Sequence, residues 1–232
     1  MRRALAALLI ALAAPATAGG LTGASYADPT TRYPHGALGD TIEHGTLVVT
    51  TAAGRRVRLV LPETRVFEDT VPRLADVDND GDREAVVVES DRARGARLAI
   101  YDDTGLIAAT PFIGRRFRWL AVVGADDLDG DGQTEIAYID RPHLARTLRV
   151  WRLEAGALVE VASATGLTNH RIGDREISGG IRHCGGRAEM IVTDTDWRRL
   201  IAVTLDNGRL TAHDLGPHAG PASLAAAMAC AN

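Results

Sequence analysis

The chain lacks several features that would assign it to a common class. It has no lysine: all 26 basic residues are arginine, against 30 acidic residues, for a formal charge of −4. This mild acidity argues against nucleic acid as a partner, because phosphate binding requires an excess of basic residues. No apolar stretch approaches the roughly 20 residues of a membrane helix. The sequence therefore predicts neither a nucleic-acid partner nor a membrane span.

Recognisable catalytic motifs are also missing. The histidines form no H-E-x-x-H motif, and no serine lies in a G-x-S-x-G setting. Acidic residues outside the two loops described below, such as Asp102 and Asp174, are typical of solvated turns. These absences favour a non-catalytic protein. The alternative is a paired-carboxylate enzyme, for which the chain has enough Asp and Glu.

The N-terminus has the anatomy of a secretory signal peptide. Arg2 and Arg3 precede an apolar run over residues 4–14, and the small residues Ala16-Thr17-Ala18 follow it. We predict that residues 1–18 are removed by cleavage after Ala18. The mature protein is then periplasmic or secreted, with a formal charge of about −6.

Cys184 and Cys230 are the only cysteines. Two cysteines in an exported chain predict a disulfide, because oxidising compartments form such bonds. The chain has no Cys-x-x-Cys redox motif. We expect the bridge to tether a C-terminal tail, residues 216–232, to the last repeat.

A repeat runs through the chain. The segment Leu74–Gly105 aligns with Gly124–Gly156, and each contains an acidic loop, an apolar strand, a polar link, a second strand and a turn. Two weaker copies follow the same plan in Gly179–Gly208 and Thr46–Pro62. Strand-rich units of roughly 40–55 residues match the period of propeller blades.

We therefore predict an all-β fold, a small or partial β-propeller of about four blades over residues 46–215, preceded by an N-terminal cap over residues 19–45. The alternatives are a β-sandwich and an open stack of blades that closes with a partner. Period-two alternation predicts the clearest strands, which are Glu84–Glu89, Leu98–Tyr101, Glu135–Ile139 and Leu148–Leu153. One short helix is expected within Ala222–Met228.

Both acidic loops read D-x-D-x-D-G-x-x-E. Alternating acids on a curled loop direct their carboxylates to one centre, and hard oxygen ligands in that number suit Ca²⁺. The seventh residue would contribute its backbone carbonyl. The predicted ligands of the two calcium sites are Asp76, Asp78, Asp80, Asp82 and Glu84, and Asp127, Asp129, Asp131, Gln133 and Glu135.

The acidic loops have two alternative interpretations. An EF-hand needs a Glu at the twelfth position, but Val87 and Tyr138 stand there, inside predicted strands. The loops could also be solvated Asp-Gly turns without metal. Against this, converging carboxylates repel one another by ~4 kcal/mol per close pair at a surface-like dielectric. A site enclosed by protein ligands favours a structural role for the ion.

The loop and the strand after it resemble the FG-GAP, or VCBS-type, repeat of integrin α-chain propellers and many secreted bacterial proteins. The resemblance is carried by Val71–Val88 and Leu120–Ile139. It implies calcium ligation by the first, third, fifth and ninth loop residues, although the family more often has Asp in ninth place. Integrin-like propellers have seven blades, more than this chain can form.

Together these observations predict an exported calcium-binding repeat protein that serves as a non-catalytic binding or scaffold module. Its partner would be an unidentified protein or glycan. The alternative is a calcium-assisted hydrolase or lyase acting on a carbohydrate or a phosphate ester. An open coordination position on the ion would favour the enzyme, and two enclosed ions would favour the binding module.

Overall fold

A computed structural model describes residues 20–231, which form 17 β-strands and one α-helix. The prediction of an all-β fold is confirmed. The predicted signal peptide lies outside the described residues. Every strand pairing is antiparallel.

The N-terminal sheet has eight strands and consists of two units. The first unit contains β1 (Leu21–Thr30), β2 (Glu43–Thr51) and β3 (Arg56–Val60), and the second contains β5 (Arg73–Ala75), β6 (Glu84–Asp91), β7 (Gly95–Tyr101) and β8 (Leu106–Ala109). Between them, β4 (Arg65–Phe67) pairs with β6 and touches β2 through His44 and Phe67. Within the predicted N-terminal cap, residues 19–45, β1 thus supplies a full strand of this sheet.

Two further sheets follow. The middle sheet contains β9 (Leu120–Asp126), β10 (Glu135–Asp140), β11 (Thr147–Glu154) and β12 (Ala157–Thr165). The C-terminal sheet contains β13 (Leu167–Thr168), β14 (Gly180–Cys184), β15 (Arg187–Asp194), β16 (Arg199–Asp206) and β17 (Arg209–Pro217). The helix α1 (Pro221–Met228) ends the described chain.

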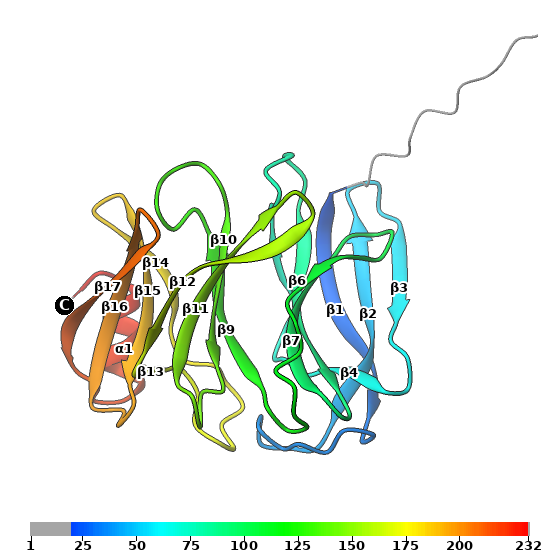
Figure 1. Cartoon of the computed structure of the whole chain (residues 1–232), viewed down its shortest axis with the longest axis horizontal. Coiled ribbons are helices and arrows are strands. Elements are labelled where there is room, and N and C mark those ends of the chain that lie inside the picture. Colours follow the sequence, from blue (N-terminus) through cyan, green and yellow to red (C-terminus); the bar gives the residue numbers. More distant parts are fainter. Residues whose placement is uncertain (1–19, 232) are drawn as a thin grey trace, which may run out of the picture.

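The sheets lie side by side in chain order, so that β1–β3 and β14–β17 occupy opposite ends of the molecule (Figure 1). Apolar layers fill the spaces between consecutive units. Val87 belongs to the layer shared with β1–β3, whereas Val86 and Val88 belong to the layer shared with the middle sheet. Because side chains alternate between the faces of a strand, a strand buried on both faces needs an unbroken apolar run. This explains the sequence Ala85–Val88.

The last apolar layer is covered by the helix. Ala227 packs against Ile191, Leu200 and Ala202 on the outer face of the C-terminal sheet. The predicted disulfide is present between Cys184, at the end of β14, and Cys230, just after α1, with their Cα atoms 5.9 Å apart. The bridge therefore tethers the tail to the last sheet as expected.

Candidate metal centre

The two acidic loops join equivalent strands: residues 76–83 connect β5 to β6, and residues 127–134 connect β9 to β10. Glu84 and Glu135 are the first residues of their strands and are almost fully buried, at 5% and 0% exposure. The Oε2 atom of Glu84 accepts a hydrogen bond of 3.0 Å from the Val77 N–H. Glu135 accepts one of 2.9 Å from Leu128. Each glutamate therefore closes its loop from a rigid strand.

The first acid of each loop shapes the turn. Asp76 Oδ2 accepts the Gly81 N–H at 3.0 Å, and Asp127 Oδ2 accepts the Gly132 N–H at 3.0 Å. Both glycines have positive φ, +93° and +87°. Side chains with a Cβ rarely adopt this conformation, which accounts for glycine at the sixth position of both loops.

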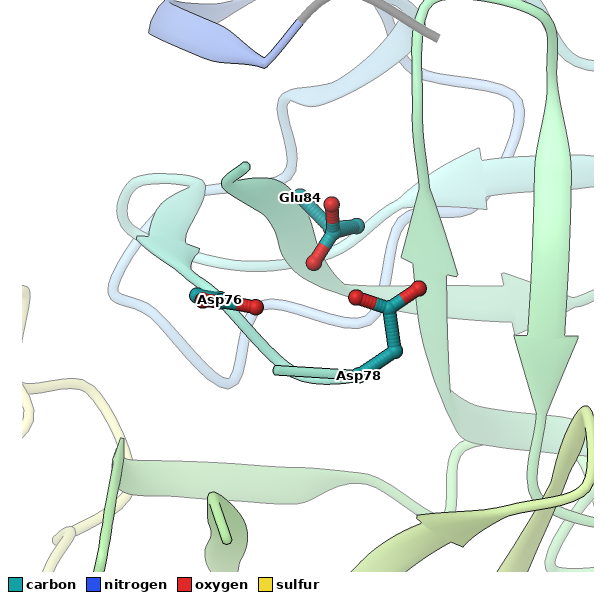
Figure 2. Close-up of side chains that lie close together, drawn as sticks. All are labelled: Asp76, Asp78 and Glu84. Atoms are coloured by element: carbon teal, nitrogen blue, oxygen red, sulfur yellow. The ribbon is translucent and has the colours of Figure 1, made fainter. Parts of the chain in front are cut away.

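Six of the ten predicted ligands come together in two groups of three. Asp76, Asp78 and Glu84 each offer a carboxylate oxygen, and the three oxygens lie within 4.8 Å of one another (Figure 2). The second group consists of Asp127, Asp129 and Glu135. Oxygens around one Ca²⁺, each 2.3–2.6 Å from the ion, have such separations. Each group could hold a metal ion.

Two of the remaining predicted ligands, Asp80 and Asp131, accept hydrogen bonds from backbone N–H groups of their own loops. Asp80 Oδ1 accepts the Asp82 N–H at 2.8 Å, and Asp131 Oδ1 accepts the Gln133 N–H at 2.8 Å. These bonds curl the second half of each loop. Neither Asp80 nor Asp131 belongs to the groups of three, and the backbone carbonyls of Asp82 and Gln133 stay predicted ligands.

The first group fits a cation on two grounds. The Oδ1 atom of Asp76 is buried and has no hydrogen-bond partner within residues 20–231, and buried polar atoms in native proteins are almost always paired. Burial, followed by the charges of Asp78, Asp80 and Asp76, raises the pKa of Glu84 to about 7. The loop thus carries negative charge that its own residues leave uncompensated.

The second group already contains a positive charge. The Arg152 guanidinium, from β11, pairs with Glu135, and it lies 3.2 Å from Asp129 and 2.9 Å from Asp131. Burial raises the pKa of Glu135, and Arg152 opposes that shift. The two loops share a sequence motif but differ in electrostatics, which the motif did not reveal.

The two loops also touch each other. Asn79 donates from Nδ2 to the Gly132 carbonyl at 2.7 Å and accepts the Thr134 N–H through Oδ1 at 3.2 Å. Its positive φ of 61° is a conformation that Asn tolerates better than most residues. A single side chain of the first loop therefore bridges to the second.

Sequence reasoning missed a second concentration of acids, formed by Glu43, Glu68 and Asp69. All three are at most 5% exposed. Glu43 begins β2, and the other two directly follow β4. No spacing motif joins them, because strand pairing and chain reversal bring them together. The one available sequence signal for this group was that Glu68 and Asp69 directly follow two apolar residues, Val66 and Phe67, which are buried.

No protein-family model matches the chain, and no curated protein matches it. A crystal structure of rhamnogalacturonan lyase YesW aligns with 82% of this chain at 16% sequence identity, with a TM-score of 0.42. The aligned part spans 38% of that lyase chain. This degree of likeness carries no argument about activity.

The structure contains one helix between residues 20 and 231, and it is neither long nor apolar enough to cross a membrane.

Proposed function

We propose that the chain is an exported calcium-binding protein of the FG-GAP or VCBS repeat type, built as a partial β-propeller of about four blades. The observation that carries the proposal is the group formed by Asp76, Asp78 and Glu84, with its buried and unpartnered Oδ1 of Asp76. Carboxylate oxygens in this arrangement suit a hard cation such as Ca²⁺. The disulfide is consistent with an oxidising compartment.

The proposed role of the ion is structural. Glu84 and Glu135 are buried and held by backbone N–H groups at the starts of central strands. A cation between the acids would tie each loop to the strand that follows it. The proposed activity is therefore binding or scaffolding of a protein or glycan by a surface that calcium stabilises, without catalysis at the ion.

The test is thermal unfolding in excess calcium and in excess chelator. Two sites filled at 100 times their dissociation constants should add ~5 kcal/mol to the free energy of unfolding. That corresponds to ~10–20 °C in the unfolding midpoint for a chain of this length. A parallel titration with Mg²⁺ should give a smaller shift, because Mg²⁺ demands octahedral geometry and releases its water reluctantly.

The double variant Asp78→Ala, Asp129→Ala should lose the calcium shift. The matched control is Glu154→Gln, which removes one exposed acid outside both loops and should keep the full shift. Equal midpoints in calcium and chelator for the unaltered protein would refute calcium binding and reduce both loops to acidic turns.

A further inference from the structure

A second candidate site lies among the turns at the far ends of the strands that carry the acidic loops. A cavity of about 260 Å³ opens between the β10–β11 turn, the segment after β13 and the β15–β16 turn. Its walls carry two arginines and two histidines, and no acid of the described chain lines it. These four residues are Arg146, Arg171, His143 and His170. We call the cavity the Arg146 pocket.

The strand β10 separates the Arg146 pocket from the second acidic loop. That loop ends at Glu135, the first residue of β10, and the turn that carries Arg146 begins after Asp140, its last residue. A strand advances ~3.3 Å per residue, so the two ends of β10 lie roughly 17 Å apart. Binding at the pocket can therefore be measured independently of binding at the loops.

The two arginines of the pocket have no acidic partner. Within residues 20–231, neither Arg146 nor Arg171 forms an ion pair with a carboxylate. Arg146 is partly buried. The guanidinium carbon of Arg171 lies over the Trp197 ring, 4.3 Å from the ring centroid. Two positive charges therefore face one cavity without a counter-ion from the described chain.

The acids of the neighbouring turns do not supply that counter-ion. Asp194 Oδ1 accepts the N–H groups of Arg198 and Arg199 at 2.7 and 3.0 Å, which holds it within its own turn. Asp174 and Asp196 form no ion pair with any arginine between residues 20 and 231. The positive charge of the pocket is thus left for a group that enters from solvent.

Two hydrogen-bonded imidazoles form another part of the wall. His170 Nε2 lies 2.9 Å from the carbonyl oxygen of Asp174, and His170 Nδ1 lies 2.9 Å from Nε2 of His143. A carbonyl oxygen only accepts, so Nε2 of His170 carries a proton. Burial lowers the pKa of His170, and burial and the charge of His170 lower the pKa of His143 to about 4. Both rings are therefore neutral at pH 7.

These contacts fix the tautomer of His143. Because neutral His170 carries its proton on Nε2, its Nδ1 accepts a hydrogen bond, and Nε2 of His143 must donate it. Nδ1 of His143 then bears a lone pair. This atom has no hydrogen-bond partner within residues 20–231 and is not buried. The pocket therefore offers one strong acceptor beside two cations.

The remaining walls are apolar and are held in an uncommon backbone conformation. Ile172 is 72% exposed and lines the cavity together with the ring of Trp197. Arg146 and Trp197 have φ values of +49° and +58°. Bulky residues rarely adopt positive φ, and such strain clusters at sites where a side chain must be placed for a function. The site suits a ligand with an apolar portion.

Neither a simple inorganic anion nor a neutral compound matches all of these walls. The anion would leave the apolar surface and the acceptor unused, and the neutral compound would leave both guanidinium groups unpaired. We propose that the Arg146 pocket binds an organic hydroxy acid. Arg146 and Arg171 pair with its carboxylate, which a guanidinium group matches in shape and charge. Nδ1 of His143 accepts a hydrogen bond from its hydroxyl group, and its apolar body lies against Trp197 and Ile172.

The experiment titrates the calcium-saturated protein with mandelate and with analogues that each lack one feature, followed by NMR. Mandelamide lacks the charge and should bind about 10-fold more weakly, because a charge-assisted hydrogen bond is lost. Phenylacetate lacks the hydroxyl group and should bind about 5-fold more weakly, because one neutral hydrogen bond is lost. Inorganic phosphate should bind more weakly than mandelate, because it has no apolar portion.

Two variants assign the contacts. Arg146→Gln removes one guanidinium group and should weaken mandelate binding about 10-fold. His143→Phe keeps an aromatic ring but has no Nδ1, so it should bind mandelate and phenylacetate equally. The matched control Arg209→Gln removes an exposed arginine at the start of β17, outside the pocket, and should bind mandelate as the unaltered protein does.

A spectroscopic readout separates the proposed contact from a general loss of structure. Mandelate should shift the ¹⁵N resonance of His143 Nδ1 in the unaltered protein by more than phenylacetate does. An absence of mandelate binding, an equal affinity for mandelamide, phenylacetate or phosphate, or an unchanged affinity in Arg146→Gln would each overturn the proposal. Because calcium is present at saturation throughout, these outcomes do not depend on what the acidic loops bind.

Discussion

Arg152 forms an ion pair with Glu135 across β10 and β11, and the equivalent position in the preceding unit holds an acid instead. In the pairing of β6 with β7, Ala85 lies opposite Tyr101. The next position of the same register places Asp102 opposite Glu84. A cation that binds in the second loop must displace the Arg152 guanidinium or share the carboxylates of the loop with it. No arginine within residues 20–231 pairs with the acids of the first loop, so the first loop should bind calcium more tightly than the second.

Calorimetric titration of two variants can measure this difference. Asp129→Ala leaves only the first loop intact, and Asp78→Ala leaves only the second. We expect the first loop to bind calcium at least 10-fold more tightly, about 1.4 kcal/mol in binding free energy. Adding Arg152→Gln to Asp78→Ala should strengthen binding at the second loop. Equal affinities of the two loops would show that Arg152 does not compete with calcium.

The Asn79 bridge predicts that the two loops affect each other. Replacement by Gly preserves the positive φ and removes both side-chain hydrogen bonds, which contribute ~0.5–1.5 kcal/mol each. Asn79→Gly should therefore lower the free energy of unfolding by ~1–3 kcal/mol, measured by urea denaturation. It should also reduce any cooperativity of calcium binding.

Asn79→Ala separates the bridge from the backbone conformation. Alanine loses the same two hydrogen bonds and in addition strains a residue whose φ is 61°. We expect Asn79→Ala to be less stable than Asn79→Gly by ~1 kcal/mol. If both variants unfold at the same urea concentration as the unaltered protein, the Asn79 bridge does not contribute to the free energy of unfolding.

The sequence predicted the features that local patterns encode. The strand that begins at Glu84 could be predicted because both of its faces are buried and its sequence is therefore apolar. The acidic loops could be predicted because acids and glycine recur in them at fixed spacing. By contrast, β1 was not predicted. Its Gly23, Asp28 and Pro29 are poor strand residues, tolerated because β1 pairs with β2 on one side only.

The missed parts of the candidate sites depend on long-range geometry. Arg152 reaches Glu135 only through the register of β10 and β11, and Asn79 reaches Gly132 only because two units stack. Glu43 and Asp69 are brought together by the pairing of β2 and β4. Periodicity in one segment carries no information about such pairings, so a single sequence could not reveal them.

The buried carboxyl group of Glu43 predicts a pH-dependent stability. Its pKa is about 10 in the folded protein, against an ordinary value of 4.5. Between these values the folded state retains a proton that the unfolded state releases. Stability therefore falls as pH rises above 4.5, by up to ~1.4 kcal/mol per pH unit for this one group.

Glu43→Gln removes that dependence, because glutamine does not ionise. The variant should resemble the unaltered protein near pH 4 and become progressively more stable than it from pH 5 to pH 9, as measured by thermal unfolding at each pH. His44 lines the same cavity as Glu43, and burial lowers its pKa. A parallel His44→Gln series therefore isolates its contribution. A constant difference between Glu43→Gln and the unaltered protein at all pH values would contradict the prediction.

The disulfide predicts that the C-terminal helix depends on a covalent tether. The helix buries Ala227 against the last sheet, and the Cys184–Cys230 bridge spans 46 residues. In the chain-entropy model a bridge of this length stabilises the folded state by up to ~4 kcal/mol. The double variant Cys184→Ser, Cys230→Ser should unfold ~8–16 °C lower and bind more of a hydrophobic dye, because release of α1 exposes Ile191 and Leu200. Reduction of the unaltered protein should have the same effect.

The calcium-induced shift of the unfolding midpoint should survive both treatments, because neither cysteine lies in the acidic loops. If the midpoint is the same with and without the disulfide, packing alone holds the helix in place.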